Sequence, residues 1–160
     1  MGVAVAFNLW VLRGELGSVA AVNDTSVHLA MVRWAAGRLS AGKLVFDGWF
    51  PNLQLGLAQF HHYQSLPHIV AGSFATIFDA ERVVTWSAYL LLAFWPLCIY
   101  RTMRLFGFDR AAAAAAAALA PLVTSASGYG YEHFSYVWRG NGIWSQLWGM
   151  WTYPLALACS

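Results

Sequence analysis

The chain has 160 residues, of which 59% are hydrophobic, 16% aromatic and only 10% charged, and its net charge is +2. Soluble domains carry roughly 25% charged residues, so this chain has too few charges to cover a water-facing surface while hiding nine Trp, ten Phe and seven Tyr. The composition excludes an ordinary soluble domain, a disordered chain and a nucleic-acid-binding protein, and it predicts an all-α, polytopic transmembrane helix bundle with interfacial juxtamembrane helices.

The first predicted element, residues 1–12, is an apolar run that ends at Arg13. It is shorter than the roughly 17 to 25 residues that a transmembrane helix needs, and it has neither the basic start nor the cleavage site of a signal peptide. We therefore expect a partial span here.

Residues 23–42 predict an amphipathic helix. Asn23 or Asp24 would cap its start and Gly42 would end it. One apolar side, formed by Val27, Met31, Trp34 and Leu39, predicts a helix that lies at the outer membrane interface. Further along, residues 66–78 predict a short apolar helix, and the sequence leaves open whether it crosses the membrane.

Two uncharged runs predict complete spans. Residues 83–100 lie between Arg82 and Arg101 and match the thickness of a bilayer core of roughly 30 Å, with Pro96 as a possible kink. The second uncharged run follows Arg110, and the span predicted from it, residues 110–124, is rich in alanine, which favours a helix packed closely inside a bundle.

The turn between these spans indicates their orientation. It holds Arg101, Arg104 and Arg110, and the positive-inside rule places such a turn in the cytoplasm. Residues 13–82 and the aromatic loop 125–142 would then lie outside.

The last predicted element, residues 143–160, is apolar, but Gly149 and Pro154 are expected to interrupt it, and it ends with the chain. We interpret it as a second partial span. Two partial spans predict that the chain is the N-terminal part of a larger multi-span membrane domain, with the missing remainder and the lipid bilayer as its partners.

Asp24 and His28 are candidates for acid–base chemistry. They lie four residues apart, so a helix would place them on one face, and a carboxylate at a helix start beside outer water could act as a general base. The alternative is that Asp24 only caps the helix.

Histidines and cysteines could also indicate a metal site. His61, His62 and His68 lack a helical zinc pattern, which favours interfacial hydrogen bonding over metal binding. Cys98 and Cys159 lie in apolar runs, which favours buried free thiols. We predict neither a metal nor another cofactor.

The loop 125–142 combines charged residues with a dense set of aromatic rings. Glu132, His133, Trp138 and Arg139 could bind a sugar and a phosphate, with the rings stacking on the sugar. The alternative is an aromatic belt with one solvated glutamate and one arginine that reaches toward the headgroups. The loop alone does not decide between them.

Three short motifs resemble those of a known family. They read Q-F-H-H-Y-Q-S-L-P-H, R-T-M-R-L-F-G-F and W-R-G-N-G, and their order resembles the membrane proteins called 6-pyruvoyl-tetrahydropterin synthase-related. The matching positions are Phe60, Tyr63, Leu66, Pro67, Arg104, Leu105, Gly107, Arg139, Gly140 and Asn141. Ser65 stands in place of a proline of that pattern, Phe106 is an insertion, and Trp138 replaces a tyrosine.

This family is in turn similar to C-type membrane glycosyltransferases, which use polyprenyl-phosphate sugars. The resemblance implies an acidic residue in the first outer loop, and Asp24 fits that position, with His28 to orient it. It further implies that Arg139 holds the donor phosphate while Glu132, His133 and Trp138 contact the sugar. The family title does not imply pterin chemistry here.

Two other functions remain open. One is a transporter or flippase for lipid-linked sugars, which would place charges inside broken helices at the bilayer centre. The other is a non-catalytic scaffold of an envelope assembly. Both predicted complete spans are free of internal charge, which favours chemistry at the outer face.

Overall fold

A computed structural model describes residues 1–13, 16, 24–52, 56–124 and 144–160. The described part is all-helical, which confirms the coarse fold class, and its only strand-like pairing is an isolated bridge between Phe50 and Leu57. The helices are α1 (Gly2–Leu12), α2 (Asp24–Ser40), α3 (Gln59–His62), α4 (Ser65–Ala75), α5 (Ala80–Ala93), α6 (Trp95–Leu105), α7 (Arg110–Thr124) and α8 (Trp144–Cys159).

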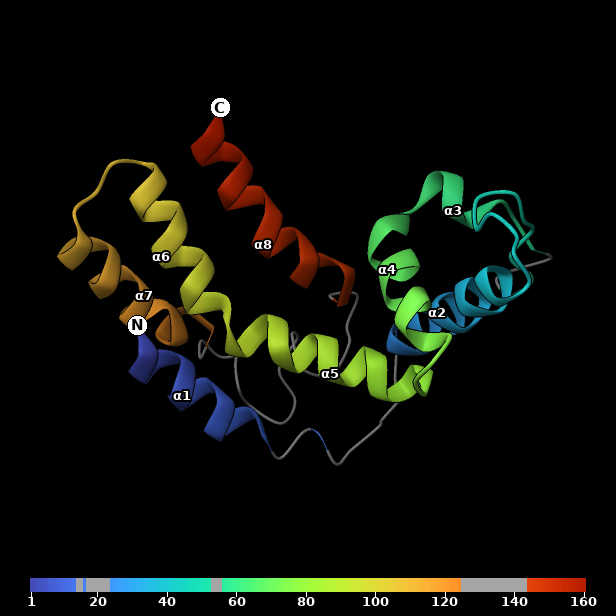
Figure 1. The fold of residues 1–160 in the computed structure, drawn as a ribbon, viewed down its shortest axis with the longest axis horizontal. Coiled ribbons are helices and arrows are strands. Elements are labelled where there is room, and N and C mark those ends of the chain that lie inside the picture. Colours follow the sequence, from blue (N-terminus) through green and yellow to red (C-terminus); the bar gives the residue numbers. More distant parts are fainter. Residues whose placement is uncertain (14–15, 17–23, 53–55, 125–143) are drawn as a thin grey trace.

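Helix α5 connects two groups of helices (Figure 1). At one end α2 packs against α4, and α3 contacts α4. At the other end α6 packs against α7, and α1 contacts α5, α6 and α7. Helix α8 contacts α5 and α6 and also reaches α2 and α4, so it links the two groups.

The predicted complete spans differ from the observed helices. Within the described residues, no helix combines the length and the apolar composition that crossing a bilayer alone would require. Helices α5 and α6 meet both requirements only as a pair, with a bend of 47° between them. The run 83–100, expected as one span with a possible kink at Pro96, is thus divided between α5 and α6, and the apolar part of α7, Arg110–Ala120, is short.

The break between α5 and α6 follows from Pro96. Proline has no backbone N–H, so Pro96 cannot donate to the carbonyl of Leu92 four residues earlier. The side chain of Asn8 on α1 replaces that donor, with its Nδ2 3.2 Å from the Leu92 oxygen and 3.5 Å from that of Ala93. Tyr89 adds a hydrogen bond from its hydroxyl to the carbonyl of Leu9 at 2.9 Å, so α1 is fixed against the bend.

Helix α8 runs through both residues that were expected to interrupt it. Gly149 and Pro154 lie inside one continuous helix, which corrects that expectation. The thiol of Cys98 donates to the carbonyl of Trp151 at 3.3 Å, and this contact joins α6 to α8 near the carbonyls that Pro154 disturbs. Cys98 is buried as expected, whereas Cys159 is exposed.

Helix α2 is buried on two faces rather than one. Leu29 and Val32 pack with Ala71 of α4, and on the other face Met31 and Ala35 pack with Phe60. An interfacial helix needs one buried face only, so α2 is more enclosed than its apolar stripe predicted. It ends at Ser40, and Gly42 follows with a positive φ of 65°, which confirms the predicted stop.

Helices α2 and α4 approach closely at Gly72. A β-carbon at this position would lie 2.7 Å from Cβ of Ala35 and 3.2 Å from the backbone nitrogen of Ala36. The residues 66–78 thus form a helix as expected, although α4 ends at Ala75. This close contact sets the distance between the side chains that α2 and α4 carry toward each other.

Candidate functional site: a buried histidine pair beside an apolar cavity

The close packing of α2 on α4 brings two histidines together. Nδ1 of His28 lies 2.8 Å from Nε2 of His68, and the rings stack with their centroids 5.1 Å apart. Both side chains are buried, with exposed fractions of 1% and 0%. A buried pair of imidazoles in hydrogen-bond contact is a polar centre inside an apolar interface.

The hydrogen bonds assign the proton positions of the pair. Nδ1 of His68 lies 2.8 Å from the carbonyl oxygen of Gln64, and a carbonyl can only accept, so this nitrogen carries the proton. Nε2 of neutral His68 then accepts from Nδ1–H of His28. As a result, Nε2 of His28 keeps a free lone pair, and it has no hydrogen-bond partner among the described residues.

Burial favours the neutral form of both rings. It lowers the pKa of His68 to about 4, an effect that the hydrogen bond to the Gln64 carbonyl opposes. It also lowers the pKa of His28, where the negative charge of Asp24 opposes the effect. Both imidazoles are therefore neutral near pH 7, as the chain of hydrogen bonds requires.

Aromatic rings enclose the pair. The ring of Trp144 lies 5.6 Å from that of His28 and 5.1 Å from that of His68, and Tyr63 lies about 6 Å from both. Trp144 is held in place because its Nε1 donates to Oγ of Ser87 at 3.0 Å and to the carbonyl of Val84 at 3.3 Å. Helix α5 thereby positions the Trp144 ring that contacts both histidines.

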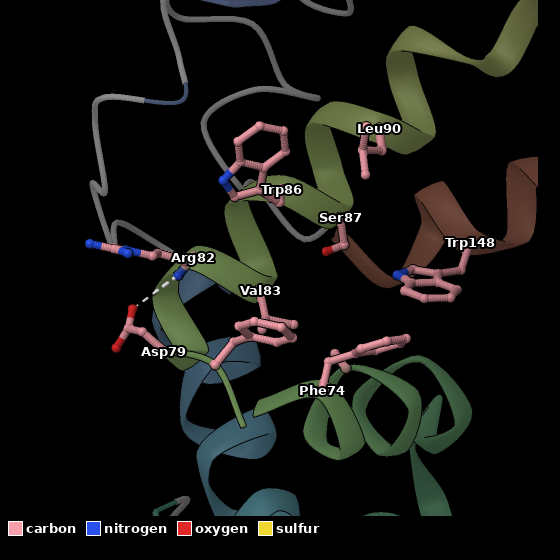
Figure 2. A pocket seen from close by; sticks show the side chains of 10 residues that line it. Phe74, Asp79, Arg82, Val83, Trp86, Ser87, Leu90 and Trp148 are labelled. Atoms are coloured by element: carbon pink, nitrogen blue, oxygen red, sulfur yellow. Dashed lines mark hydrogen bonds between the residues drawn. The ribbon is translucent and has the colours of Figure 1, made fainter. Parts of the chain in front are cut away.

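An apolar cavity of about 490 Å³ lies among α4, α5 and α8 (Figure 2). Helices α4, α5 and α8 and the α4–α5 turn line it through Ala71, Phe74, Phe78, Asp79, Arg82, Val83, Trp86, Ser87, Leu90 and Trp148. Asp79 and Arg82 are the only charged lining residues, and in Figure 2 they lie at the opposite end from Trp148. The cavity is therefore apolar with one charged end.

Asp79 and Arg82 differ in how they are engaged. Oδ1 of Asp79 accepts a hydrogen bond from the backbone N–H of Arg82 at 3.1 Å and so caps α5. The guanidinium of Arg82 has no carboxylate partner within the described ranges, in contrast to Arg33, which pairs with Glu81. Arg82 is exposed at the edge of the cavity, and in Figure 2 its side chain extends away from the apolar lining side chains.

Trp144 and Trp148 connect the cavity to the histidine pair. Their rings make an edge-to-face contact at 6.0 Å, and Ser87, which binds Trp144, also lines the cavity. Nε1 of Trp148 is buried and lacks an acceptor within the described part of the chain. A ligand in the cavity that carries an oxygen acceptor would satisfy this N–H.

The predicted site residues fall into two groups. Asp24 is the first residue of α2 and is exposed, and His28 lies one turn later and is buried. The two residues therefore share a helix face, as predicted. The hydrogen-bond partner of His28 Nδ1, however, is His68. Glu132, His133, Trp138 and Arg139 lie outside the described residues, as does the whole loop 125–142. Asn23, the other candidate cap, is also outside them.

Sequence reasoning missed the pairing of His68 with His28, the contact of Trp144 with both rings, and the cavity. His68 was expected at the membrane interface, whereas the structure buries it and leaves His61 and His62 exposed. The available signal was a single histidine inside the apolar run 66–78. In the parts of the chain that the structure describes, no three metal-ligating side chains come together.

Comparisons of the chain with known proteins found no relative. No family model, no curated protein and no solved structure matches the chain. The resemblance to 6-pyruvoyl-tetrahydropterin synthase-related membrane proteins therefore rests on the short motifs and stays a prediction.

Proposed function

We propose that the chain is part of an integral membrane protein that transfers a sugar from a lipid-phosphate donor at the outer membrane face, in the manner of C-type glycosyltransferases. The observation that carries the proposal is the apolar cavity whose charged edge holds Arg82, a cation without a carboxylate partner among the described residues. An amphiphile with an apolar chain and a phosphate matches this distribution of surfaces, because its chain gains by burial while its phosphate gains from a guanidinium.

The volume of the cavity is large enough for part of one lipid chain. Ligand sites generally measure about 300 to 1,000 Å³, and 490 Å³ falls in that range. The phosphate-proximal part of a polyprenyl chain would occupy it, with the remainder in the bilayer. The aromatic rings of Phe74, Trp86 and Trp148 suit an unsaturated chain, since flat rings pack against its planar double bonds.

The surface of the described part supports a lipid environment. Several large apolar side chains are at least 58% exposed, among them Val3, Trp10, Ile77, Phe78 and Leu119. Such side chains are costly in water when they form patches and are favourable in lipid. The bent pair α5–α6 has the length and composition to cross the bilayer.

The proposed chemistry needs few groups. A lipid phosphate is already a good leaving group, so the site needs a base for the acceptor hydroxyl and cations for the departing phosphate. Asp24 and His28 supply the acid–base function. Arg139 holds the phosphate together with Arg82, and Glu132, His133 and Trp138 contact the sugar.

We expect Leu90→Trp to weaken binding of undecaprenyl phosphate at least tenfold, because the larger ring fills the cavity. Native mass spectrometry of the detergent-solubilised chain measures this affinity. Leu105→Trp is the matched control, since Leu105 is 37% exposed, close to the 40% of Leu90, and does not line the cavity. Equal affinity of both variants would contradict a lipid chain in the cavity.

The same assay separates chain binding from phosphate binding. Arg82→Gln should weaken binding of undecaprenyl phosphate and leave binding of the uncharged polyprenol unchanged. Sugar transfer from a loaded donor then tests the enzyme directly. Movement of the donor between leaflets without transfer would instead favour the flippase.

We expect a cysteine at Lys43 to label from outside intact cells and a cysteine at Phe106 to label only after the cells are opened. Both positions are exposed, and the prediction follows from the cytoplasmic placement of the arginine-rich turn. The experiment uses a Cys159→Ser background, because Cys159 is exposed while Cys98 is buried. Labelling of both positions from one side would refute this topology.

A further inference from the structure

We propose that the turn between α6 and α7 binds anionic phospholipids of the bilayer leaflet opposite to the one in which α5 begins. Phe106 and Phe108 enter the boundary between headgroups and acyl chains, and Arg101 and Arg110 bind lipid phosphates. This inference goes beyond the proposed sugar transfer. It rests only on the membrane placement of α5 and α6 in that proposal, and the turn lies at the opposite end of the molecule from α2 and α4 (Figure 1).

The level of the turn in a bilayer follows from the bent pair α5–α6. Residues 83–100 carry no charge between Arg82 and Arg101. Helical residues rise about 1.5 Å each, so this run covers roughly 27 Å, close to the roughly 30 Å of a hydrocarbon core. The bend of 47° shortens this extent somewhat. Arg101 and the turn after it therefore lie at the phosphate level of one leaflet.

The backbone of the turn has a fixed geometry. Helix α6 ends in a Schellman motif, in which Gly107 has a positive φ of 87°. The N–H of Gly107 donates to the carbonyl of Arg104 at 3.1 Å, and the next N–H along the chain donates to the carbonyl of Met103 at 3.1 Å. The carbonyl of Phe108 in turn accepts from the Arg104 guanidinium at 2.7 Å. The turn therefore holds its side chains on a rigid frame.

Two aromatic rings on this frame leave about half of their surface uncovered. Phe106 is 54% exposed and Phe108 is 49% exposed, and Leu105 beside them is 37% exposed. The residue after the glycine of a Schellman motif often packs back onto its helix, which Phe108 does only in part. Rings in water forfeit the gain of burial, whereas rings between headgroups and acyl chains recover it.

Arginines surround these rings, and the nearby carboxylate is already engaged. Arg101 and Arg110 are exposed and have no carboxylate partner within the described ranges. Oδ1 of Asp109 accepts from the backbone N–H groups of Ala111 and Ala112, at 2.7 and 2.9 Å, and so caps α7. Three arginines and one aspartate leave the turn with a net charge of +2.

The positions of the arginines favour an anion at the end of the helix pair. Arg110 is the first residue of α7, where the positive end of the helix dipole makes a cation unfavourable. Arg101 precedes Arg104 by three residues on α6, so the two share a helix face. Helix α6 packs along α7, which brings the charges of both helices to one end. Phosphate is the anion that a guanidinium binds with two parallel hydrogen bonds.

An anionic phospholipid matches this combination of charge and apolar surface. A free phosphate would pair with the guanidiniums but would leave both phenylalanine rings in water. A zwitterionic lipid carries its own cation, which competes for the phosphate. Phosphatidylglycerol has a single net negative charge and two acyl chains, so two such lipids would neutralise the turn and cover its rings.

Native mass spectrometry of the detergent-solubilised chain, titrated with dioleoyl phosphatidylglycerol, tests the charges. An arginine near a lipid surface contributes about fivefold in affinity, so Arg101→Gln combined with Arg110→Gln should weaken binding roughly 25-fold. Lysine at both positions should retain most of the affinity. Lys43→Gln is the matched control, because Lys43 is an exposed cation on the loop after α2. An unchanged affinity of the double glutamine variant would overturn the proposal.

A photo-crosslinker tests the position of the rings. The photoreactive analogue p-benzoyl-phenylalanine replaces Phe106, and the chain is placed in vesicles made of equal parts of phosphatidylglycerol and phosphatidylcholine. We expect lipid adducts that are enriched in phosphatidylglycerol. The same analogue in place of Phe46, which is 43% exposed on the loop after α2, should give no such enrichment. Absence of lipid adducts at Phe106, or equal capture of both lipids, would contradict the proposal.

The binding assays also separate this inference from the proposed function. Arg82→Gln should leave the affinity for phosphatidylglycerol unchanged, and the double glutamine variant of Arg101 and Arg110 should still bind undecaprenyl phosphate in the cavity. A parent chain that binds phosphatidylglycerol no more tightly than phosphatidylcholine would refute only the lipid site at the turn. A parent chain that binds no undecaprenyl phosphate would refute only the proposed function.

Discussion

Gly72→Val is expected to destabilise the chain by about 1 to 3 kcal/mol, because it overpacks a helix contact with no spare room. The first side-chain carbon alone would lie 2.7 Å from Cβ of Ala35, and neither helix backbone can yield without separating α2 from α4. Thermal unfolding in detergent measures the loss, which corresponds to roughly 2 to 4 °C per kcal/mol for a chain of this size.

Gly37→Val is the matched control for this substitution. Gly37 also lies inside a helix, on α2, and a β-carbon there meets no atom within 4 Å. Valine has a slightly better helix propensity than glycine, so this variant should be as stable as the parent or slightly more so. Equal destabilisation by the two variants would show that the close approach of α2 to α4 is incorrect.

Acidification from pH 7.5 to pH 5 should destabilise the chain by about 2 kcal/mol through His68 alone. The pKa of His68 falls from 6.5 in the unfolded chain to about 4 in the fold. Between these values the unfolded state binds the extra proton, so stability falls as pH falls through this window. Each pH unit corresponds to about 1.4 kcal/mol, and His28 acts in the same direction.

His68→Gln isolates this contribution. The amide does not titrate, so the difference in stability between the variant and the parent should be pH-dependent only through the histidine pair, while the carboxylates contribute equally to both. Chemical unfolding at several pH values provides the measurement. A parent chain whose stability relative to His68→Gln is constant from pH 7.5 to pH 5 would contradict a buried neutral pair.

Most helices could be located from the sequence because apolar runs and their breaks are local signals. The runs at 1–12, 66–78 and 110–124 correspond to α1, α4 and α7 within a few residues. The break after Phe94 was suggested by Pro96, which removes one backbone donor. The continuity of α8 was not visible, because contacts with α6 compensate the carbonyls near Pro154.

Of the two histidines at the centre of the candidate site, the sequence indicated the role of His28 but not the contact with His68. Asp24 and His28 share a helix face, which is a local spacing, and the sequence indicated His28 for that reason. His68 lies 40 residues further along, and its contact depends on the approach of two helices at Gly72. Residues of three helices and a turn line the cavity, so it could not be predicted from any single segment of the sequence.

Asn8 has a consequence for the biogenesis of the protein. Its amide supplies hydrogen bonds to carbonyls that lie 84 and 85 residues later in the chain. During synthesis α1 therefore emerges long before its partners, and without Asn8 these carbonyls of Leu92 and Ala93 would lack its hydrogen bonds, which is costly in hydrocarbon. In the proposed membrane setting, α1 must remain beside the insertion machinery until α5 and α6 arrive, so that the three helices enter the lipid as one unit.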